Sequence, residues 1–165
     1  MKSTITTIAT TPSLTTTEST SSSSTIITTT TQQSRWSYTG SMNYEREDHT
    51  SCVLTDGKVL VAGGRNDTGP LNTVELYDPS TGFWTMTGSM NIARAEHAVS
   101  ALTNGKVLVT GSDNNIDILN STELYDPSTA TWTMTSSMNT ARKEHTASVL
   151  TNGKILVTGG YDDKI

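Results

Sequence analysis

The sequence predicts an all-β protein built as a partial β-propeller and preceded by a disordered Ser/Thr-rich tail. Three observations predict this fold: a repeat of 48 residues, four short strand-like segments in each repeat, and a first segment of different composition. A period of about 40–50 residues with strand patterning is typical of propeller blades, in which each repeat forms a four-stranded sheet.

The repeat is carried by residues that recur at a step of 48 positions. Five sets share this step: Trp36, Trp84 and Trp132; Arg46, Arg94 and Arg142; His49, His97 and His145; Gly57, Gly105 and Gly153; Gly63, Gly111 and Gly159. From Trp132 to Gly160, 21 of 29 residues are identical to those that begin at Trp84. A fold without internal repeats would not show this self-similarity.

Each unit is predicted to contain four short strands, a to d. In the second full set they are expected at residues 97–102, 106–110, 122–125 and 132–135. Asn104-Gly105, between strands a and b, predicts a type I′ turn because both residue types tolerate a positive φ. The apolar run Val107–Val109 predicts a strand that is buried on both faces.

The repeats do not add up to a closed propeller. Residues 35–165 start with a lone strand d at Trp36, continue with two full sets of strands and end with strands a and b. The units lie near 36–83, 84–131 and, incomplete, 132–165, which is about 2.7 blades, whereas propellers typically have about 4–8. We therefore expect a fragment of a longer protein, or copies that associate to supply the missing blades.

Residues 1–34 form a separate segment, in which 22 of 34 residues are Ser or Thr. Such a segment buries too little apolar surface to offset its ordering entropy, so it is predicted to be disordered. Three interpretations of this segment are left open: a plain linker, an O-glycosylated stalk, and a gene-model or cloning accident. No secretory signal is indicated, because the apolar stretch of a signal peptide is missing.

Composition and charge exclude several classes of function. The net charge of −5, with only 11 Lys and Arg residues, argues against nucleic-acid binding by phosphate neutralisation. No apolar run is long enough to predict a membrane-spanning helix. The single cysteine, Cys52, cannot form an internal disulfide, and no Cys/His spacing resembles a zinc site. We predict no catalytic, metal or cofactor-binding residues and no enzymatic activity.

The repeated residues resemble the kelch repeat. The resemblance rests on a glycine pair after strand b, a tyrosine and, seven residues later, a tryptophan: Gly63-Gly64, Tyr77 and Trp84, then Tyr125, Trp132 and Gly159-Gly160. Ser112 departs from the pattern, because a second glycine is expected there. The resemblance covers residues 35–165 and implies a β-propeller with one four-stranded blade per repeat. The galactose-oxidase-like copper enzymes share this fold, but their Tyr, His and Cys-modified Tyr set has no counterpart in this sequence.

Residues that recur in every unit are expected to serve the blades. The histidines are predicted to form hydrogen bonds into a neighbouring loop, because sheets packed about 10 Å apart would keep equivalent nitrogens too far apart for one zinc ion. The arginines and the acids before each histidine are expected in one inter-blade network: Asp48, Glu96 and Glu144. The Tyr and Trp residues are expected to supply apolar area between blades, the repeated Met residues to anchor loops, and Cys52 to be a small core residue.

The units diverge on one face only. The a–b and c–d turns hardly change between units, whereas the b–c and d–a loops, which leave the opposite face, do change. Function is usually carried by loops on a rigid scaffold, so a protein partner is expected on this face, with neutral drift of loop positions as the alternative. The candidate residues are Tyr44, Glu45, Glu47, Arg65, Asp67, Ile92, Asp113, Asn115, Lys143 and Tyr161.

The sequence thus favours a non-catalytic kelch-repeat propeller segment that acts as a protein-interaction scaffold. One alternative is the non-catalytic propeller part of a larger galactose-oxidase-like or carbohydrate-active enzyme. Another is the substrate-receptor propeller of a ubiquitin ligase, whose helical adaptor-binding domain the first 34 residues cannot provide.

The compartment is left open by the sequence. The Ser/Thr tract and two glycosylation acceptor patterns, Asn66-Asp67-Thr68 and Asn120-Ser121-Thr122, both expected in b–c loops, favour the outside of the cell. The missing signal peptide and the single unpaired cysteine favour the inside.

Overall fold

The computed structural model describes residues 7–9, 14–21, 24–31 and 35–162. All regular elements in these ranges are β-strands, and none of the described residues lies in a helix that could cross a membrane. The repeats from Ser41 onward belong to one compact unit, and Ile5–Gly40 form a second unit.

The first complete blade is a four-stranded antiparallel sheet. Its strands a to d are β5 (Thr50–Val53), β6 (Val59–Ala62), β9 (Val74–Asp78) and β10 (Phe83–Met86), in the order β10-β9-β6-β5. A short hairpin of β7 (Arg65–Asn66) and β8 (Gly69–Pro70) projects from the b–c connection. The predicted strand pattern is therefore present in the first blade.

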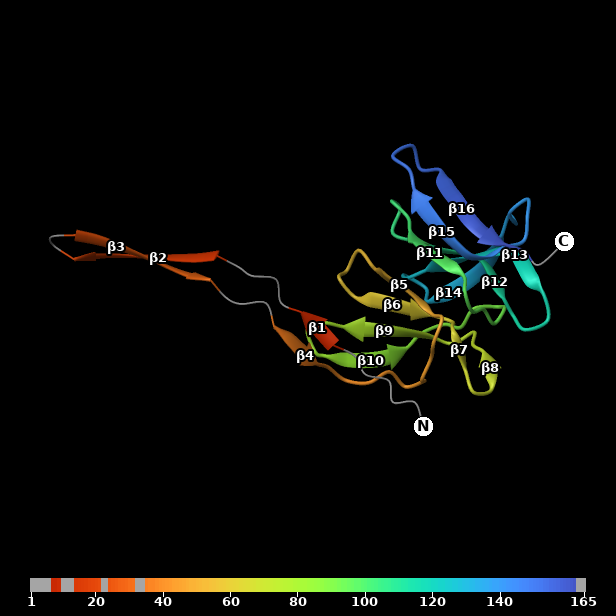
Figure 1. The fold of residues 1–165 in the computed structure, drawn as a ribbon, viewed down its shortest axis with the longest axis horizontal. Helices are drawn as coiled ribbons and strands as arrows, with labels where there is room; N and C mark the ends of the chain where they lie inside the picture. The colour runs from red at the N-terminus through yellow and green to blue at the C-terminus, as the bar shows by residue number, and fades with distance from the viewer. Residues whose placement is uncertain (1–6, 10–13, 22–23, 32–34, 163–165) are drawn as a thin grey trace. The chain divides into compact units, whose positions relative to one another are not determined.

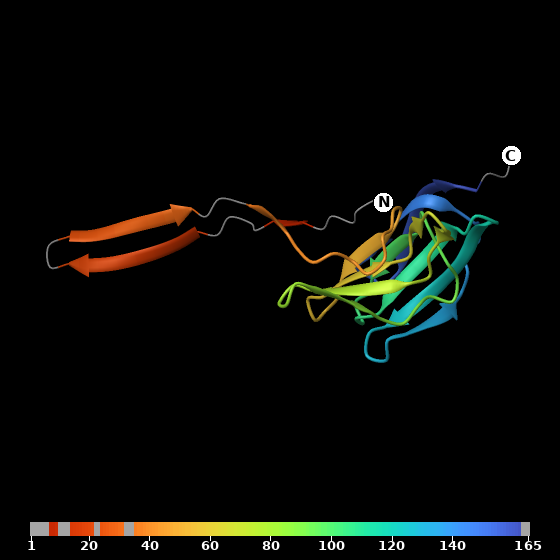
Figure 2. The same cartoon turned by 90° about the horizontal axis from the view of Figure 1, so that it is seen from below.

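The second blade repeats this sheet, and the third contains strands a and b. The second blade has β11 (Ala98–Ala101), β12 (Val107–Asp113), β13 (Ile118–Asp126) and β14 (Thr131–Thr135), and the third has β15 (Lys143–Val149) and β16 (Ile155–Tyr161). The three sheets lie side by side, with the a strands β5, β11 and β15 adjacent (Figure 1; Figure 2 gives the view from below). This is the arrangement of consecutive propeller blades and confirms the predicted fold class.

The spacing of seven residues between Tyr and Trp follows from the c–d hairpin. Tyr77 pairs with Trp84 and Tyr125 with Trp132 across the strands, with ring centroids 5.0 Å apart in each case. In the second blade, the turn between Tyr125 and Trp132 is stabilised by Asp126, whose Oδ1 accepts hydrogen bonds from the Ser128 hydroxyl and amide. The Ser128 hydroxyl is the main reason that the pKa of Asp126 is lowered to about 2.

The predicted type I′ turn between strands a and b is wrong. Gly105 has a φ of 81°, but Asn104 is not among the residues with positive φ. The Gly105 amide bonds to the Leu102 carbonyl, and the Leu102 amide to the Lys106 carbonyl, which makes a three-residue loop of the kind that ends in a left-handed glycine. Asn104 instead accepts a hydrogen bond at Oδ1 from the Lys106 amide at 3.1 Å.

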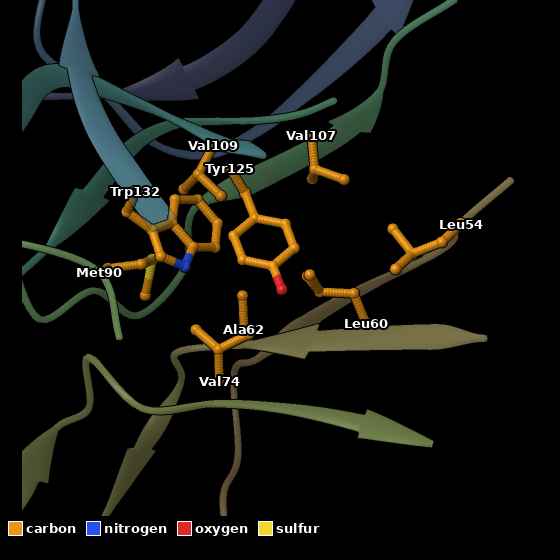
Figure 3. Close-up of a cluster of buried hydrophobic side chains, with 9 residues drawn as sticks. All are labelled: Leu54, Leu60, Ala62, Val74, Met90, Val107, Val109, Tyr125 and Trp132. Carbon is orange, nitrogen blue, oxygen red and sulfur yellow. The ribbon is translucent and has the colours of Figure 1, made fainter. Parts of the chain in front are cut away.

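The best-developed core lies between the first and second blades. We call the side of a blade that faces the next blade its trailing face, and the opposite side its leading face. The trailing face of the first blade meets the leading face of the second in one buried cluster: Leu54, Leu60, Ala62 and Val74 against Met90, Val107, Val109, Tyr125 and Trp132 (Figure 3). Because each strand b contributes to both faces of its blade, its apolar run is continuous.

The second unit contains part of the Ser/Thr-rich segment, for which disorder stays a prediction. Its described parts include a hairpin of β2 (Leu14–Ser21) and β3 (Ser24–Thr31), and β1 (Thr7–Ala9), which pairs with β4 (Trp36–Tyr38). These strands are rich in Thr and Ile, whose β-branched side chains suit extended backbone. The other residues of 1–34 lie outside the described part. Trp36, expected to start a lone strand d, lies in β4 and is 72% exposed.

Candidate functional site

The candidate site is the face from which the variable loops leave the blades. We call it the loop face; it comprises the d–a loops (residues 41–49, 87–97 and 136–142), the b–c loops (residues 63–73 and 114–117) and the strand ends beside them. A buried arginine and glutamate hold the d–a loops of the first two blades in place.

In the second blade this pair is Arg94 and Glu123. Arg94 Nη2 lies 2.9 Å from Glu123 Oε1, and both side chains are completely buried. The carboxylate also accepts hydrogen bonds from the backbone amides of Asn91 at 2.7 Å and Ile92 at 3.0 Å. The backbone position of Ile92, one of the predicted site residues, is therefore set by a buried charge.

The first blade has the same arrangement around Arg46 and Glu75. Arg46 Nη2 lies 2.8 Å from Glu75 Oε1, which also accepts a hydrogen bond from the Tyr44 amide at 3.0 Å. Burial raises the pKa of Glu75, but hydrogen bonds from Asn43, Arg46 and Tyr44 outweigh it and leave the pKa below its ordinary value. The arginine side chain was expected in an inter-blade network; it instead bonds within its own blade.

The acids next to the histidines do form an inter-blade ionic chain on the loop face. Arg65 Nε, at the start of β7, lies 3.0 Å from Asp48 Oδ2, and its Nη2 contacts Glu96 of the second blade. Lys143, at the start of β15, lies 3.3 Å from Glu96 Oε2 and 2.8 Å from Asp113 Oδ2. We call these five residues, which join three blades with alternating charge, the ionic chain.

Tyr161 extends the ionic chain at the end of β16. The Lys143 ammonium lies 5.4 Å from the centre of the Tyr161 ring, within range of a cation–π contact. The Tyr161 hydroxyl donates a hydrogen bond to Glu144 Oε1 at 3.2 Å. The hydrogen bond to Asp113 is the main cause that raises the pKa of Lys143, so this lysine is charged at every physiological pH.

The backbone beneath this chain is in an unusual conformation. Asp48, Glu96 and Glu144 have φ values of 52°, 56° and 54°, in the left-handed region that non-glycine residues rarely occupy. The Glu96 amide bonds to the Asp48 carbonyl, and the Glu144 amide to the Glu96 carbonyl. Equivalent positions are thus in direct contact here, and the separation of about 10 Å expected between blades does not hold at this inner edge.

The histidines make the inter-blade hydrogen bonds expected of them, but to strands and not to loops. His97 Nε2 lies 2.6 Å from Thr50 Oγ1 of the first blade, and His145 Nε2 lies 2.9 Å from Thr110 Oγ1 of the second. Burial, together with the charge of Arg94, lowers the pKa of His97 to about 3. His97 is therefore neutral in the folded protein at physiological pH.

Acidification is expected to destabilise the protein through His97. The unfolded chain takes up this proton near pH 6.5, whereas the folded chain does so only near pH 3. The contribution of His97 to the free energy of unfolding is thus complete above pH 6.5 and is lost as the pH falls toward 3. Urea unfolding should show a loss of about 2 kcal/mol between pH 7 and pH 5 that His97→Gln lacks. His49→Gln, at an exposed site, should still show most of this loss of stability between pH 7 and pH 5. If His97→Gln lost as much stability over this range as the wild type, the assignment to His97 would be contradicted.

The structure brings four of the ten predicted site residues into one cluster: Arg65, Asp113, Lys143 and Tyr161. Glu47 pairs with Arg65 through backbone hydrogen bonds. Of all the others, Tyr44, Glu45, Glu47, Asp67 and Asn115 are exposed, and Ile92 is half-buried. A Cβ on Gly69 would lie 3.6 Å from Asn115 Nδ2, so the b–c loops of the first two blades are neighbours.

Sequence reasoning missed two contributions to this face. The repeated acids were assigned to the inter-blade network and not to the candidate site, although Asp48 and Glu96 are two of the five charged residues in the ionic chain. Ile116, at the tip of the second b–c loop, is 85% exposed and was not selected. Its signal is an isolated apolar residue in the polar turn Asn114–Asp117.

The two acceptor patterns for glycosylation differ in position. Asn66 lies at the end of β7, and its Oδ1 accepts hydrogen bonds from the exposed Thr68. Asn120 and Thr122 lie within β13, contrary to the expected loop; Asn120 donates to the Met138 carbonyl, and Thr122 is buried.

A family model described as the KLHDC2/KLHL20/DRC7 Kelch-repeats domain matches residues 15–164. The chain belongs to the kelch-repeat family. A search of the curated proteins found no match.

The first glycine of the kelch pair lies against the backbone of the next blade. A Cβ on Gly63 would lie 2.5 Å from the Arg94 carbonyl oxygen, and one on Gly111 would lie 2.3 Å from that of Arg142. Ser112 replaces the second glycine of the kelch pattern with a φ of 159°, against 88° at Gly64. A register shift between Thr110 and Ser112 accompanies this change.

Proposed function

We propose that this kelch segment is a protein-interaction scaffold that binds a protein partner on its loop face. The observation that carries the proposal is the ionic chain. Arg65, Asp113 and Lys143, which vary from unit to unit and lie far apart in the sequence, are joined with the repeated acids Asp48 and Glu96 in one network across three blades. A rigid surface of this kind loses little entropy when a partner docks on it.

The ionic chain supports the face more than it contacts the partner. The Arg65 and Lys143 side chains are only 24% and 12% exposed and are already neutralised by acids. Three exposed side chains of the loop face are better placed to anchor a partner: Tyr44, Ile116 and Tyr161, at 43%, 85% and 47% exposure. Aromatic and apolar anchors of this kind carry much of the energy in protein interfaces.

The test compares exposed substitutions on opposite faces. The full-length protein is tagged in its own cells, its bound proteins are cross-linked, and each is quantified for the wild type and for variants. The loop-face variant is Tyr44→Ser with Ile116→Ser. The matched control is Phe83→Ser, which is 70% exposed beside a c–d turn on the opposite side.

We expect partners to be lost about tenfold or more in the loop-face variant, because truncating a binding anchor costs on the order of 1 kcal/mol or more each. The control should retain them. Equal recovery in both variants, or greater loss with Phe83→Ser, would overturn the proposal.

A second candidate is the substrate-receptor propeller of a ubiquitin ligase. The match to a kelch-repeat family model is the observation that favours it. On this reading, the full-length protein should co-purify with a ligase scaffold, and its loop-face partners should accumulate when the proteasome is inhibited. Absence of both effects would leave the scaffold function alone.

A further inference from the structure

The hairpin of β7 and β8 places an asparagine amide next to a threonine hydroxyl on the loop face. Asn66 pairs with Gly69 across the hairpin, so Asp67 and Thr68 form its tip, and both of these residues are exposed. The Thr68 hydroxyl and amide donate hydrogen bonds to Asn66 Oδ1 at 2.6 and 2.9 Å. This is an Asx turn, in which the asparagine side chain bonds to the backbone two residues later. Neither bond uses Asn66 Nδ2.

These groups are the ones that N-glycosylation requires. The reaction takes an asparagine with a hydroxyl residue two positions later and any residue except proline between them, as in Asn66-Asp67-Thr68. The amide nitrogen displaces the lipid pyrophosphate from a lipid-linked oligosaccharide. A bond forms between Nδ2 and C1 of the sugar, the bond between C1 and the pyrophosphate oxygen breaks, and one Nδ2 proton passes to a base of the transferase. Hydrogen bonds to the amide oxygen make the N–H groups more acidic, so the Thr68 contacts favour the loss of that proton.

The second acceptor pattern, at Asn120, lies in a different setting. Asn120 Nδ2 donates to the Met138 carbonyl at 3.0 Å, and Thr122 is buried, with its hydroxyl bonded to a backbone carbonyl. Asn72, one repeat earlier, makes the equivalent bond in the first blade. Asn120 is thus a structural residue of the blade, and its acceptor pattern exists only because Thr122 stands where the first blade has the buried Val74.

The repeat also supplies a matched turn without the hydroxyl. Asn114 is equivalent to Asn66 at the 48-residue step, and its Oδ1 accepts hydrogen bonds from the Ile116 and Asp117 amides at 3.0 and 2.7 Å. Ile116 is 85% exposed and stands where the first blade has Thr68. The acceptor hydroxyl is therefore what the second turn lacks.

The cysteine of this chain is compatible with the oxidising compartments in which N-glycosylation takes place. Cys52 is half-buried, and burial raises the pKa of its thiol to about 11. The thiolate is the form that is oxidised and that exchanges disulfides, and a thiol with so high a pKa forms little thiolate at physiological pH. The unpaired cysteine therefore does not count against such a compartment, although the sequence alone suggested that it did.

We propose that Asn66 is an N-glycosylation site of this protein and that Asn120 is not. The acceptor atom is Asn66 Nδ2, and the donor is an oligosaccharide carried on a lipid pyrophosphate. The hairpin tip selects Asn66 because it exposes Thr68 and bonds it to the amide oxygen, whereas β13 keeps Thr122 buried. The glycan stands on the loop face, but its attachment requires no protein partner, so the proposal is independent of the proposed function.

The test is mass spectrometry of the full-length protein purified from its own cells. Peptide N-glycosidase in heavy-oxygen water removes each N-glycan and leaves a labelled aspartate in place of the asparagine. The peptide that contains Asn66 should carry this label, and the peptides that contain Asn114 and Asn120 should not. A sample without the glycosidase measures the background from spontaneous deamidation.

Variants expressed in the same cells test the local cause. Thr68→Ala should remove the glycan, and Thr68→Ser should retain it because serine keeps the hydroxyl. Ile116→Thr gives Asn114 the hydroxyl that its turn lacks and should add a second glycan. Asn120→Gln should leave the number of glycans unchanged. Positions 68 and 116 are exposed, so the variants at these positions are expected to fold as the wild type does.

Three results would each overturn the proposal: a wild type without label at Asn66, label at Asn120 to the same extent as at Asn66, or a Thr68→Ala variant that keeps the Asn66 glycan. An Ile116→Thr variant without a second glycan would contradict the role assigned to the turn. None of these measurements depends on recovery of a protein partner, so they remain decisive even if the proposed function fails its own test.

Discussion

Replacing Arg94 with alanine is expected to lower the free energy of unfolding by about 3–5 kcal/mol, because it leaves Glu123 as a buried charge without its partner. Both side chains are completely buried, and burial already lowers the pKa of Arg94. The substitution also removes hydrogen bonds from the guanidinium to the Gly111 and Ser121 carbonyls. Urea unfolding followed by tryptophan fluorescence measures the loss.

The repeat supplies the control for this experiment. Arg142 is the equivalent residue of the third blade, where it is half-buried and donates to the Gly159 carbonyl at 2.7 Å. Arg142→Ala should cost less than about 1.5 kcal/mol, the scale of one ordinary hydrogen bond. The double variant Arg94→Met with Glu123→Met should lose less stability than Arg94→Ala, because no charge is left buried. Equal losses in Arg94→Ala and Arg142→Ala would contradict the assigned role of the pair.

Replacing Trp132 with alanine is expected to cost about 3–5 kcal/mol, the usual range for removing a buried aromatic side chain. Trp132 is 8% exposed and belongs to the core between the first two blades (Figure 3). Its Nε1 donates a hydrogen bond to the Gly88 carbonyl of the preceding d–a loop at 2.8 Å. The variant therefore loses apolar contact and leaves a carbonyl without its donor.

The two other tryptophans, which are less buried, serve as controls for this substitution. Trp84 is half-buried, so Trp84→Ala should cost less than Trp132→Ala. Trp36 is 72% exposed, and Trp36→Ala should change stability by no more than about 0.5 kcal/mol. Calorimetric unfolding of the three variants should rank them in this order; equal effects would show that burial does not set their contributions.

The blades were predictable because their signals are local. The Tyr–Trp spacing encodes the c–d hairpin, and strand d, expected at 132–135, is observed as Thr131–Thr135. The a–b turn was placed correctly but given the wrong geometry, since a residue pair does not reveal which of its members takes the positive φ. In the tail, the strands of the described parts are rich in β-branched residues, which suit extended backbone, and disorder of the segment stays a prediction.

The candidate site was predictable only in part. Variation between units selected Arg65, Asp113, Lys143 and Tyr161 one by one, but nothing in the local sequence shows that they touch. Their contacts depend on how consecutive blades pack, because this packing brings residues 30 and 31 positions apart in the sequence to the same inner edge. The acids that join them were assigned to the scaffold because a repeated residue carries no sign of which neighbour it contacts.

By itself, the sequence determined the repeat, the strand content of each blade and the places where turns occur, because these depend on residues that are close together in the chain. Only the tertiary structure decided what each repeated residue does. Leu54 and Leu150, like Trp36 and Trp132, occupy equivalent sequence positions yet differ widely in exposure. The physical reason is that burial in a stack of sheets depends on the neighbouring sheet. Residues at equivalent positions of the repeat therefore have different roles wherever the described structure contains no adjacent blade on one side.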